Sequence, residues 1–290
     1  MKPNVHSTIK ALLNEKLAKL ETHFNADIFC YYGALVDGLE NQILNIIEEL
    51  ATDANKKNRL VVVLTTSGGS AVAVERYVNI FRQHYEIVDF VVPDYAYSAG
   101  TIFCMSGDNI YMDYFSVLGP IDPQVQNKEG KWVAALGYLD KVNEAIEKSR
   151  LNTITQAEFL MIKDLDLAEL RGYEQAKELT IDLLKKWLVK YKFKNWNSHA
   201  TTPAILGNPV TLDEKQARAE EIAGQLSDNS VWKSHSRPIN IERLGELRLK
   251  VEDFSGDVTL RGLIRDYHDL MSDYVTSNGL PLFVNTRKFI

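Results

Sequence analysis

The stretch Arg59-Leu-Val-Val-Val-Leu-Thr-Thr-Ser-Gly-Gly-Ser70 decides the fold class. Its first half is a continuous apolar run, which is typical of a strand buried on both faces in a parallel sheet. Paired glycines at 68 and 69 follow, where the backbone can adopt positive φ and approach another group closely. Apolar residues at helical spacing then continue from Ala71 to His84. The stretch therefore predicts a buried strand, a glycine turn and a helix.

Other strand and helix patterns alternate with this one along the first part of the chain. They predict strands at 27–35, 87–92 and 109–112, and helices at 7–23, 39–50 and 98–106. Such alternation calls for a parallel sheet covered by helices. We therefore expect an α/β fold.

The chain changes character after about residue 136. A nearly continuous helical pattern covers 137–194, a loop rich in Asn, Ser, Thr and Pro covers 195–211, and helices are expected at 212–226 and 241–247 around a loop at 228–238. We divide the chain into an N-terminal helix (1–26), a βαβ core (27–136), a helical arm (137–211), and the rest of the core with a C-terminal extension (212–290).

Composition excludes several classes of protein. The 290 residues carry 33 basic and 39 acidic side chains, a net charge of −6, which argues against a dedicated nucleic-acid binder. Two cysteines, Cys30 and Cys104, exclude a disulfide framework, and both are expected in the core of a protein from a reducing compartment. No apolar run approaches the ~20 residues of a membrane span, and the N-terminus lacks a signal peptide. We expect a cytoplasmic protein and, since no zinc motif is present, no metal or cofactor.

Two turns follow buried strands, and sites form beyond the carboxyl ends of such strands. The glycine turn at 67–70 lacks the P-loop lysine, but its N–H groups could form an oxyanion hole; taken alone, the glycine pair does not decide against a tight turn without chemistry, which is the commoner case. In the second turn, Tyr97-Ser98-Ala99-Gly100-Thr101, Ser98 opens a helix between small residues. Ser98 is either a helix cap or the nucleophile of a sharp strand-to-helix turn.

Together with Ser116-Val-Leu-Gly-Pro-Ile-Asp-Pro-Gln124, these turns resemble the Clp protease proteolytic subunit and its relatives in the ClpP/crotonase superfamily. Within that superfamily the chain looks most like the serine dehydrogenase proteinase family, which is related to signal peptide peptidase A. The resemblance covers about 27–125 and resumes weakly at 234–251. It implies a ClpP/crotonase-like spiral of βαβ units with an inserted helical arm and a C-terminal extension.

The resemblance also implies roles for individual residues. Ser98 would be the nucleophile, and the oxyanion hole would be formed by Gly68, with Gly69 adjacent, and Ala99. The histidine of Clp proteases would fall within 117–123, where this chain has no histidine but has Asp122. Conversely, His235 stands where those proteases have their aspartate. The implied triad is Ser98, Asp122 and His235, since triads are recognised by geometry and not by chain order.

Other interpretations stay open at the level of sequence. Asp122, between two prolines, could merely fix a turn, and His199 is a rival base. Lys148 or Lys163 could form a Ser-Lys dyad, as the resemblance to signal peptide peptidase A would imply. The remaining histidines, on helical segments without matching context, are expected at the surface: His6, His23, His84 and His268.

The function implied by the resemblance is a serine peptidase that hydrolyses peptide bonds through an acyl-enzyme on Ser98. The alternative is a non-proteolytic scaffold or binding subunit on the same fold, because a fold does not fix a function. The expected partners are a peptide or protein substrate, further copies of the chain in a homo-oligomer, and an ATP-dependent unfoldase as an additional candidate.

Overall fold

The computed structural model describes residues 5–126, 132–163 and 165–290. At its centre is a six-stranded sheet with the order β10-β1-β2-β3-β5-β9. The strands are β1 (Asp27–Gly33), β2 (Arg59–Thr65), β3 (Ile87–Val92), β5 (Ile110–Met112), β9 (Glu252–Asp253) and β10 (Leu282–Asn285). All neighbouring strands are parallel except β10, which pairs antiparallel with β1. The predicted α/β fold with a mostly parallel sheet is confirmed.

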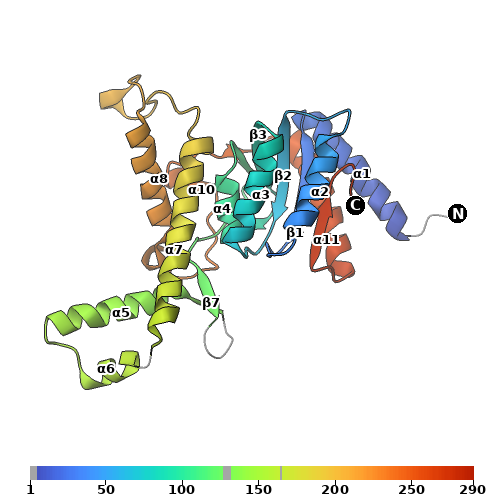
Figure 1. Ribbon diagram of the computed structural model, residues 1–290. Helices are drawn as coiled ribbons and strands as arrows, with labels where there is room; N and C mark the ends of the chain where they lie inside the picture. The colour runs from blue at the N-terminus through green and yellow to red at the C-terminus, as the bar shows by residue number, and fades with distance from the viewer. Residues whose placement is uncertain (1–4, 127–131, 164) are drawn as a thin grey trace.

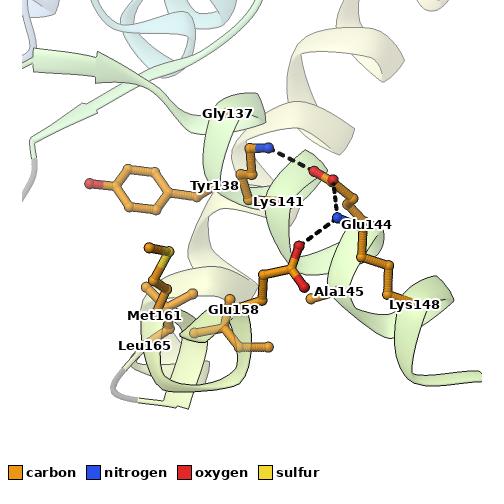
Figure 2. Close-up of a pocket in the computed structure, with 10 residues that line it drawn as sticks. Gly137, Tyr138, Lys141, Glu144, Ala145, Lys148, Glu158, Met161 and Leu165 are labelled. Atoms are coloured by element: carbon orange, nitrogen blue, oxygen red, sulfur yellow. Dashed lines mark hydrogen bonds and ion pairs between the residues drawn. The ribbon is translucent and has the colours of Figure 1, made fainter. Parts of the chain in front are cut away.

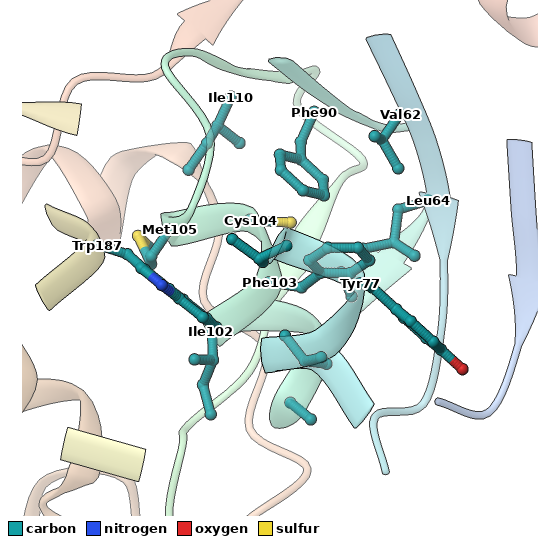
Figure 3. Close-up of a cluster of buried hydrophobic side chains, with 14 of the residues drawn as sticks. Val62, Leu64, Tyr77, Phe90, Ile102, Phe103, Cys104, Met105, Ile110 and Trp187 are labelled. Carbon is teal, nitrogen blue, oxygen red and sulfur yellow. The ribbon is translucent and has the colours of Figure 1, made fainter. Parts of the chain in front are cut away.

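Helices cover both faces of the sheet (Figure 1). One face carries α2 (Glu40–Ala51), α3 (Ala71–His84) and α4 (Ala99–Met105), and the other carries α1 (Val5–Phe24) and α11 (Val258–Ser277). The alternation along β2 explains why the run at 60–64 is wholly apolar, because Val62 and Leu64 enter the first cluster while Val61 and Val63 enter the second. Figure 3 shows the first cluster, in which Phe103 packs between Phe90 and Tyr77.

The C-terminal region completes the second face of the sheet. Helix α11 packs along α1, and β10 extends the sheet beyond β1 with Asn285 opposite Cys30. The bounds of neither element were predicted, although His268 was expected to lie on a helical segment. Cys30 and Cys104 are buried free thiols, as expected.

The helical arm has two parts. Helices α5 (Ala135–Arg150) and α6 (Gln156–Lys163) extend away from the sheet, whereas α7 (Leu167–Trp187) runs back to it (Figure 1). There α7 packs against α4 and against α8 (Leu212–Ser227), and Trp187 is buried beside Met105 and Ile102 (Figure 3). The helical pattern is therefore interrupted twice, and its C-terminal part belongs to the body of the molecule.

Short elements connect these layers. They are β4 (Tyr95–Ala96), β6 (Val117–Leu118), the hairpin of β7 (Gln124–Gln126) and β8 (Trp132–Ala134), a π-helical turn (Leu188–Lys192), a 3₁₀ turn (Pro203–Ile205), α9 (Asn229–Trp232) and α10 (Ile241–Glu246). Within the described part of the chain, no helix is both long and apolar enough to cross a membrane, and no cluster of three or more His, Cys, Asp or Glu side chains is placed to hold a metal ion.

The prediction that His268 lies at the surface is wrong. Its side chain is on the inner face of α11 and is buried, with Nε2 3.1 Å from Thr65 Oγ1 at the end of β2. Burial lowers the pKa of the imidazole. His268 is thus a core histidine, on the opposite face of the sheet from α3 and α4.

Candidate active site

Ser98 lies at the junction of β4 and α4 and has a strained backbone. Its φ is 52° and its ψ is −116°, a conformation that residues with a β-carbon rarely adopt. Such strain costs about 1–3 kcal/mol and is found mostly at functional sites. The Ser98 side chain makes no capping hydrogen bond to α4. A capping role therefore does not account for Ser98, whereas a sharp strand-to-helix turn that presents the hydroxyl does.

The glycine turn lies directly against this serine. Gly68 has a φ of 102°, and a β-carbon on it would stand 2.8 Å from Ser98 Cβ and 2.8 Å from the carbonyl oxygen of Tyr97. Gly69 has a φ of 143°, and a β-carbon there would stand 2.0 Å from the carbonyl oxygen of Leu35. Both glycines are needed for the close approach of the turn to Ser98 and to the chain after β1.

The three expected oxyanion donors differ in their present bonding. The N–H groups of Ala99 and Gly69 form no hydrogen bond within the part of the chain that the structure describes. The N–H of Gly68 donates to Thr66 Oγ1 at 3.0 Å. Thr66 was not singled out from the sequence, although a hydroxyl side chain two residues before a glycine pair was the available signal.

Asp122 and His235 form a part-buried pair. His235 Nδ1 lies 2.9 Å from Asp122 Oδ1, across 113 residues of chain. The Asp122 side chain is 1% exposed and that of His235 15%. Asp122 Oδ2 has no hydrogen-bond partner among the described residues. A carboxylate that accepts from Nδ1–H orients the ring and leaves Nε2 as its other donor or acceptor, as in a serine-hydrolase triad.

Backbone contacts bring these two residues together. Leu118 of β6 and Ile239 exchange two backbone hydrogen bonds of 2.9 Å each, which places the loop that carries His235 beside the segment that leads to Asp122. The N–H of Ile121 donates to the carbonyl of Leu226 at the end of α8. The segment that leads to Asp122 is thus hydrogen-bonded both to the loop that carries His235 and to the end of α8.

Ser98 and Asp122 follow two paired strands. β4 and β6 are parallel, with Tyr95 opposite Val117 and Ala96 opposite Leu118. The turn that carries Ser98 and the segment that carries Asp122 therefore leave the same edge of this small sheet. No hydrogen bond joins Ser98 Oγ to His235 within the described residues, so that contact of the predicted triad stays a prediction.

The rival bases lie in other surroundings. His199 Nε2 is 3.1 Å from Glu214 Oε1 and its ring meets the edge of Trp196. Lys148, on the arm, forms ion pairs with Glu144 at 2.8 Å and with Glu158 at 2.6 Å (Figure 2). These two carboxylates raise the pKa of Lys148, the opposite of what a lysine base requires. Lys163 is exposed at the end of α6.

The sequence of residues 37–216 matches the family described as ClpP-like SDH-type serine proteinase. The chain belongs to this family. The matched region includes Ser98 and Asp122 and ends before His235. The central sheet with helices on both faces is consistent with a ClpP-like fold.

Similar proteins are distant from this chain. Two uncharacterized proteins of Methanocaldococcus jannaschii are similar to this chain. The first is 28% identical over 190 residues, which cover 66% of this chain and 51% of that protein. The second is 30% identical over 148 residues, which cover 48% of this chain and 50% of that protein. The chain thus spans about half the length of these curated relatives. A solved structure of a mutant of the 1510-N membrane-bound stomatin-specific protease aligns over 80% of this chain and 81% of its own, with 13% identity and a TM-score of 0.46.

Replacing Gly68 with alanine tests whether the turn must lie against Ser98. We expect Gly68→Ala to slow the reaction of Ser98 with a fluorophosphonate by at least ~10²-fold, because the new β-carbon would displace the turn that carries Ser98. The matched control is Gly172→Ala in α7, where a β-carbon meets nothing within 4 Å; it should label normally and gain about 1 kcal/mol of stability from helix propensity. A Gly68→Ala protein that labels at the wild-type rate would contradict this account.

Proposed function

We propose that this chain is a serine peptidase that hydrolyses peptide bonds through an acyl-enzyme on Ser98. The observation that carries the proposal is the strained, uncapped conformation of Ser98 after β4, beside the strand β6 that leads to the part-buried Asp122–His235 pair. Family membership supports serine protease chemistry at the coarse level. The triad itself is our proposal.

Each residue has a defined role in the proposed reaction. When substrate binds, His235 Nε2 accepts the proton of Ser98 Oγ as the oxygen attacks the peptide carbonyl carbon. Asp122 accepts the hydrogen bond from Nδ1–H and stabilises the imidazolium. His235 then gives the proton to the leaving amine, and a water molecule hydrolyses the ester by the same steps in reverse order.

The oxyanion would be stabilised by backbone donors. The Ala99 N–H stands at the first turn of α4, where the helix dipole also favours negative charge. The second donor would come from the glycine turn. Since the Gly68 N–H donates to Thr66 in the present conformation, either Gly69 supplies the second donor or the Gly68 N–H leaves Thr66 when substrate binds.

A non-catalytic scaffold would account for the fold but not for the strained, uncapped conformation of Ser98. A non-catalytic subunit would gain nothing from about 1–3 kcal/mol of strain at a residue that makes no capping bond. The compartment we propose is the cytoplasm, on the strength of two free cysteine thiols. An ATP-dependent unfoldase stays a candidate partner that family resemblance alone suggests.

Ser98→Ala should abolish fluorophosphonate labelling and peptide hydrolysis without loss of stability. No capping bond is removed, so the free energy of unfolding should change by less than the ~1 kcal/mol of an ordinary cap. Thr211→Ala is the control, because Thr211 caps α8 in a capping box; it should lose about 1 kcal/mol and label normally. Labelling that persists in Ser98→Ala would assign the nucleophile elsewhere, and a wild type that does not label between pH 6 and 9 would favour the scaffold.

His235→Ala and Asp122→Asn should each lower kcat by about 10³–10⁴-fold, because the members of a triad act as a unit. His199→Ala and Lys148→Ala, whose side chains pair with glutamates, should stay close to wild type. Measuring kcat for the four variants with one peptide substrate decides the base. An inactive His199→Ala would transfer the role to that histidine, and an inactive Lys148→Ala would support a dyad.

We also propose that the arm joins copies of this chain into a homo-oligomer. No residue of α6 is buried, and its apolar side chains Phe159, Leu160 and Met161 are 52%, 55% and 78% exposed. Between α5 and α6 lies a cleft of about 700 Å³, with Tyr138 and Ile162 in its lining (Figure 2). α6 contacts α5 and is joined to it by the Lys148–Glu158 ion pair, but an eight-residue helix that leaves its apolar side chains exposed is marginal in water, so another surface should cover them.

Sedimentation at micromolar concentration should give a mass that is a multiple of the 32.9 kDa chain. Met161→Glu should shift the protein toward the monomer by placing a charge in the apolar contact. Val258→Glu is the control, since Val258 is 84% exposed but lies at the start of α11. A wild-type mass near that of one chain, unchanged by a tenfold rise in concentration, would refute the proposal.

A further inference from the structure

A single buried hydroxyl joins the nucleophile turn to the segment that carries Asp122. Thr101 lies one helical turn after Ser98 and its side chain is fully buried. Thr101 Oγ1 accepts a hydrogen bond from the N–H of Gly119 at 3.0 Å. It also lies 2.8 Å from the carbonyl oxygen of Gly119 and 2.9 Å from that of Ala96. Since a hydroxyl has one proton, it donates to one of these carbonyls at a time.

The backbone groups that Thr101 Oγ1 contacts lie just before Ser98 and just before Asp122 in the sequence. Ala96 is the last residue of β4, two residues before Ser98, and Gly119 follows β6, three residues before Asp122. The approach at Gly119 is tight, because a β-carbon there would stand 3.2 Å from Tyr97 Cα. The Thr101 hydroxyl is thus a direct side-chain link between the turn of Ser98 and the segment of Asp122.

Packing alone does not explain a threonine at this position. Its helix neighbours Ile102, Phe103, Cys104 and Met105 are all buried apolar or thiol side chains, and a valine would fill the same volume as Thr101. Without the hydroxyl, the buried N–H of Gly119 would lose the acceptor it has here. The segment would then move to find another acceptor, and Asp122 would move with it.

We propose that Thr101 is a positioning residue for acyl transfer, which sets the separation between Ser98 and the Asp122–His235 pair. Thr101 touches neither substrate nor the reacting atoms. The inference rests on the proposed function, because the separation matters only if Ser98 and His235 exchange a proton.

The test compares three variants by their kcat and KM for a p-nitrophenyl ester and by the rate of fluorophosphonate labelling at Ser98. Thr101→Val removes the hydroxyl at constant volume and should lower kcat and the labelling rate by about 10²-fold with KM nearly unchanged. Thr101→Ser keeps the hydroxyl and should restore both to within a few-fold of wild type. Thr180→Val, a buried threonine on α7, is the control and should behave as wild type.

Two results would overturn the inference. Thr101→Val could react at the wild-type rate, or Thr101→Ser could lose as much as Thr101→Val, which would assign the role to the methyl group and to packing. If circular dichroism shows Thr101→Val to be unfolded, Thr101→Cys decides, because a thiol of similar size is only a weak donor and acceptor; it should fall between Ser and Val, and equality with Thr101→Ser would overturn the inference.

Failure of the proposed function gives a different result. In that case the wild type itself does not label at Ser98, and the inference falls with it. If the wild type labels at Ser98 and Thr101→Val reacts at the same rate, the proposed peptidase function stands and only the role of Thr101 is refuted.

Discussion

The two backbone hydrogen bonds between Leu118 and Ile239 are the contact on which the candidate site depends. Asp122 is buried, and a buried carboxylate is destabilising unless a partner compensates it. Its partner, His235, comes from a loop that the whole helical arm separates from β6 in sequence. Closing so long an insertion costs conformational entropy, which the packing of α7 against α4 and α8 must offset. The arm therefore contributes to the site through the burial of residues such as Trp187, although it supplies no proposed catalytic side chain.

The strain at Ser98 requires support from its surroundings. Three contacts provide it: the pairing of β4 with β6, the close approach of Gly68, and the Thr101 hydroxyl. All three come from other residues, so the positive φ of Ser98 is supported by contacts from outside the residue. An unsupported turn would relax toward an ordinary helix N-terminus, in which serine bonds to the backbone and is no longer presented to a substrate.

Much of the fold could be predicted because its strands carry strong local signals. The apolar run of β2 and the glycine pair after it are unambiguous, and they place the switch from strand to helix correctly. Helix α11 and β10 were not predicted, since their amphipathic patterns are ordinary and their role depends on α1, far away in sequence. His268 was assigned to the surface for a related reason, because sequence alone does not show which side of α11 faces the sheet. The hydroxyl of Thr66, two residues before Gly68, was a sequence signal for a local hydrogen bond, but whether the Gly68 N–H donates to it depends on the exact backbone angles of the turn.

Asp122 stands where the resemblance to Clp proteases would place a histidine, and His235 stands where it would place an aspartate, yet the two side chains still form a pair. The position after β6 is buried. A carboxylate suits it, because the group there only has to accept one hydrogen bond in a fixed position. The position in the loop is more exposed, and an imidazole suits it, because in the proposed triad the ring contacts both the carboxylate and Ser98. Since the chemistry requires only that sequence of contacts, the acid and the base can come from either segment as long as the bridge between Leu118 and Ile239 holds the two segments together. The site thus requires that the two backbone segments lie close together and that the carboxylate is more deeply buried than the imidazole. Neither requirement fixes which of the two residues comes first in the sequence.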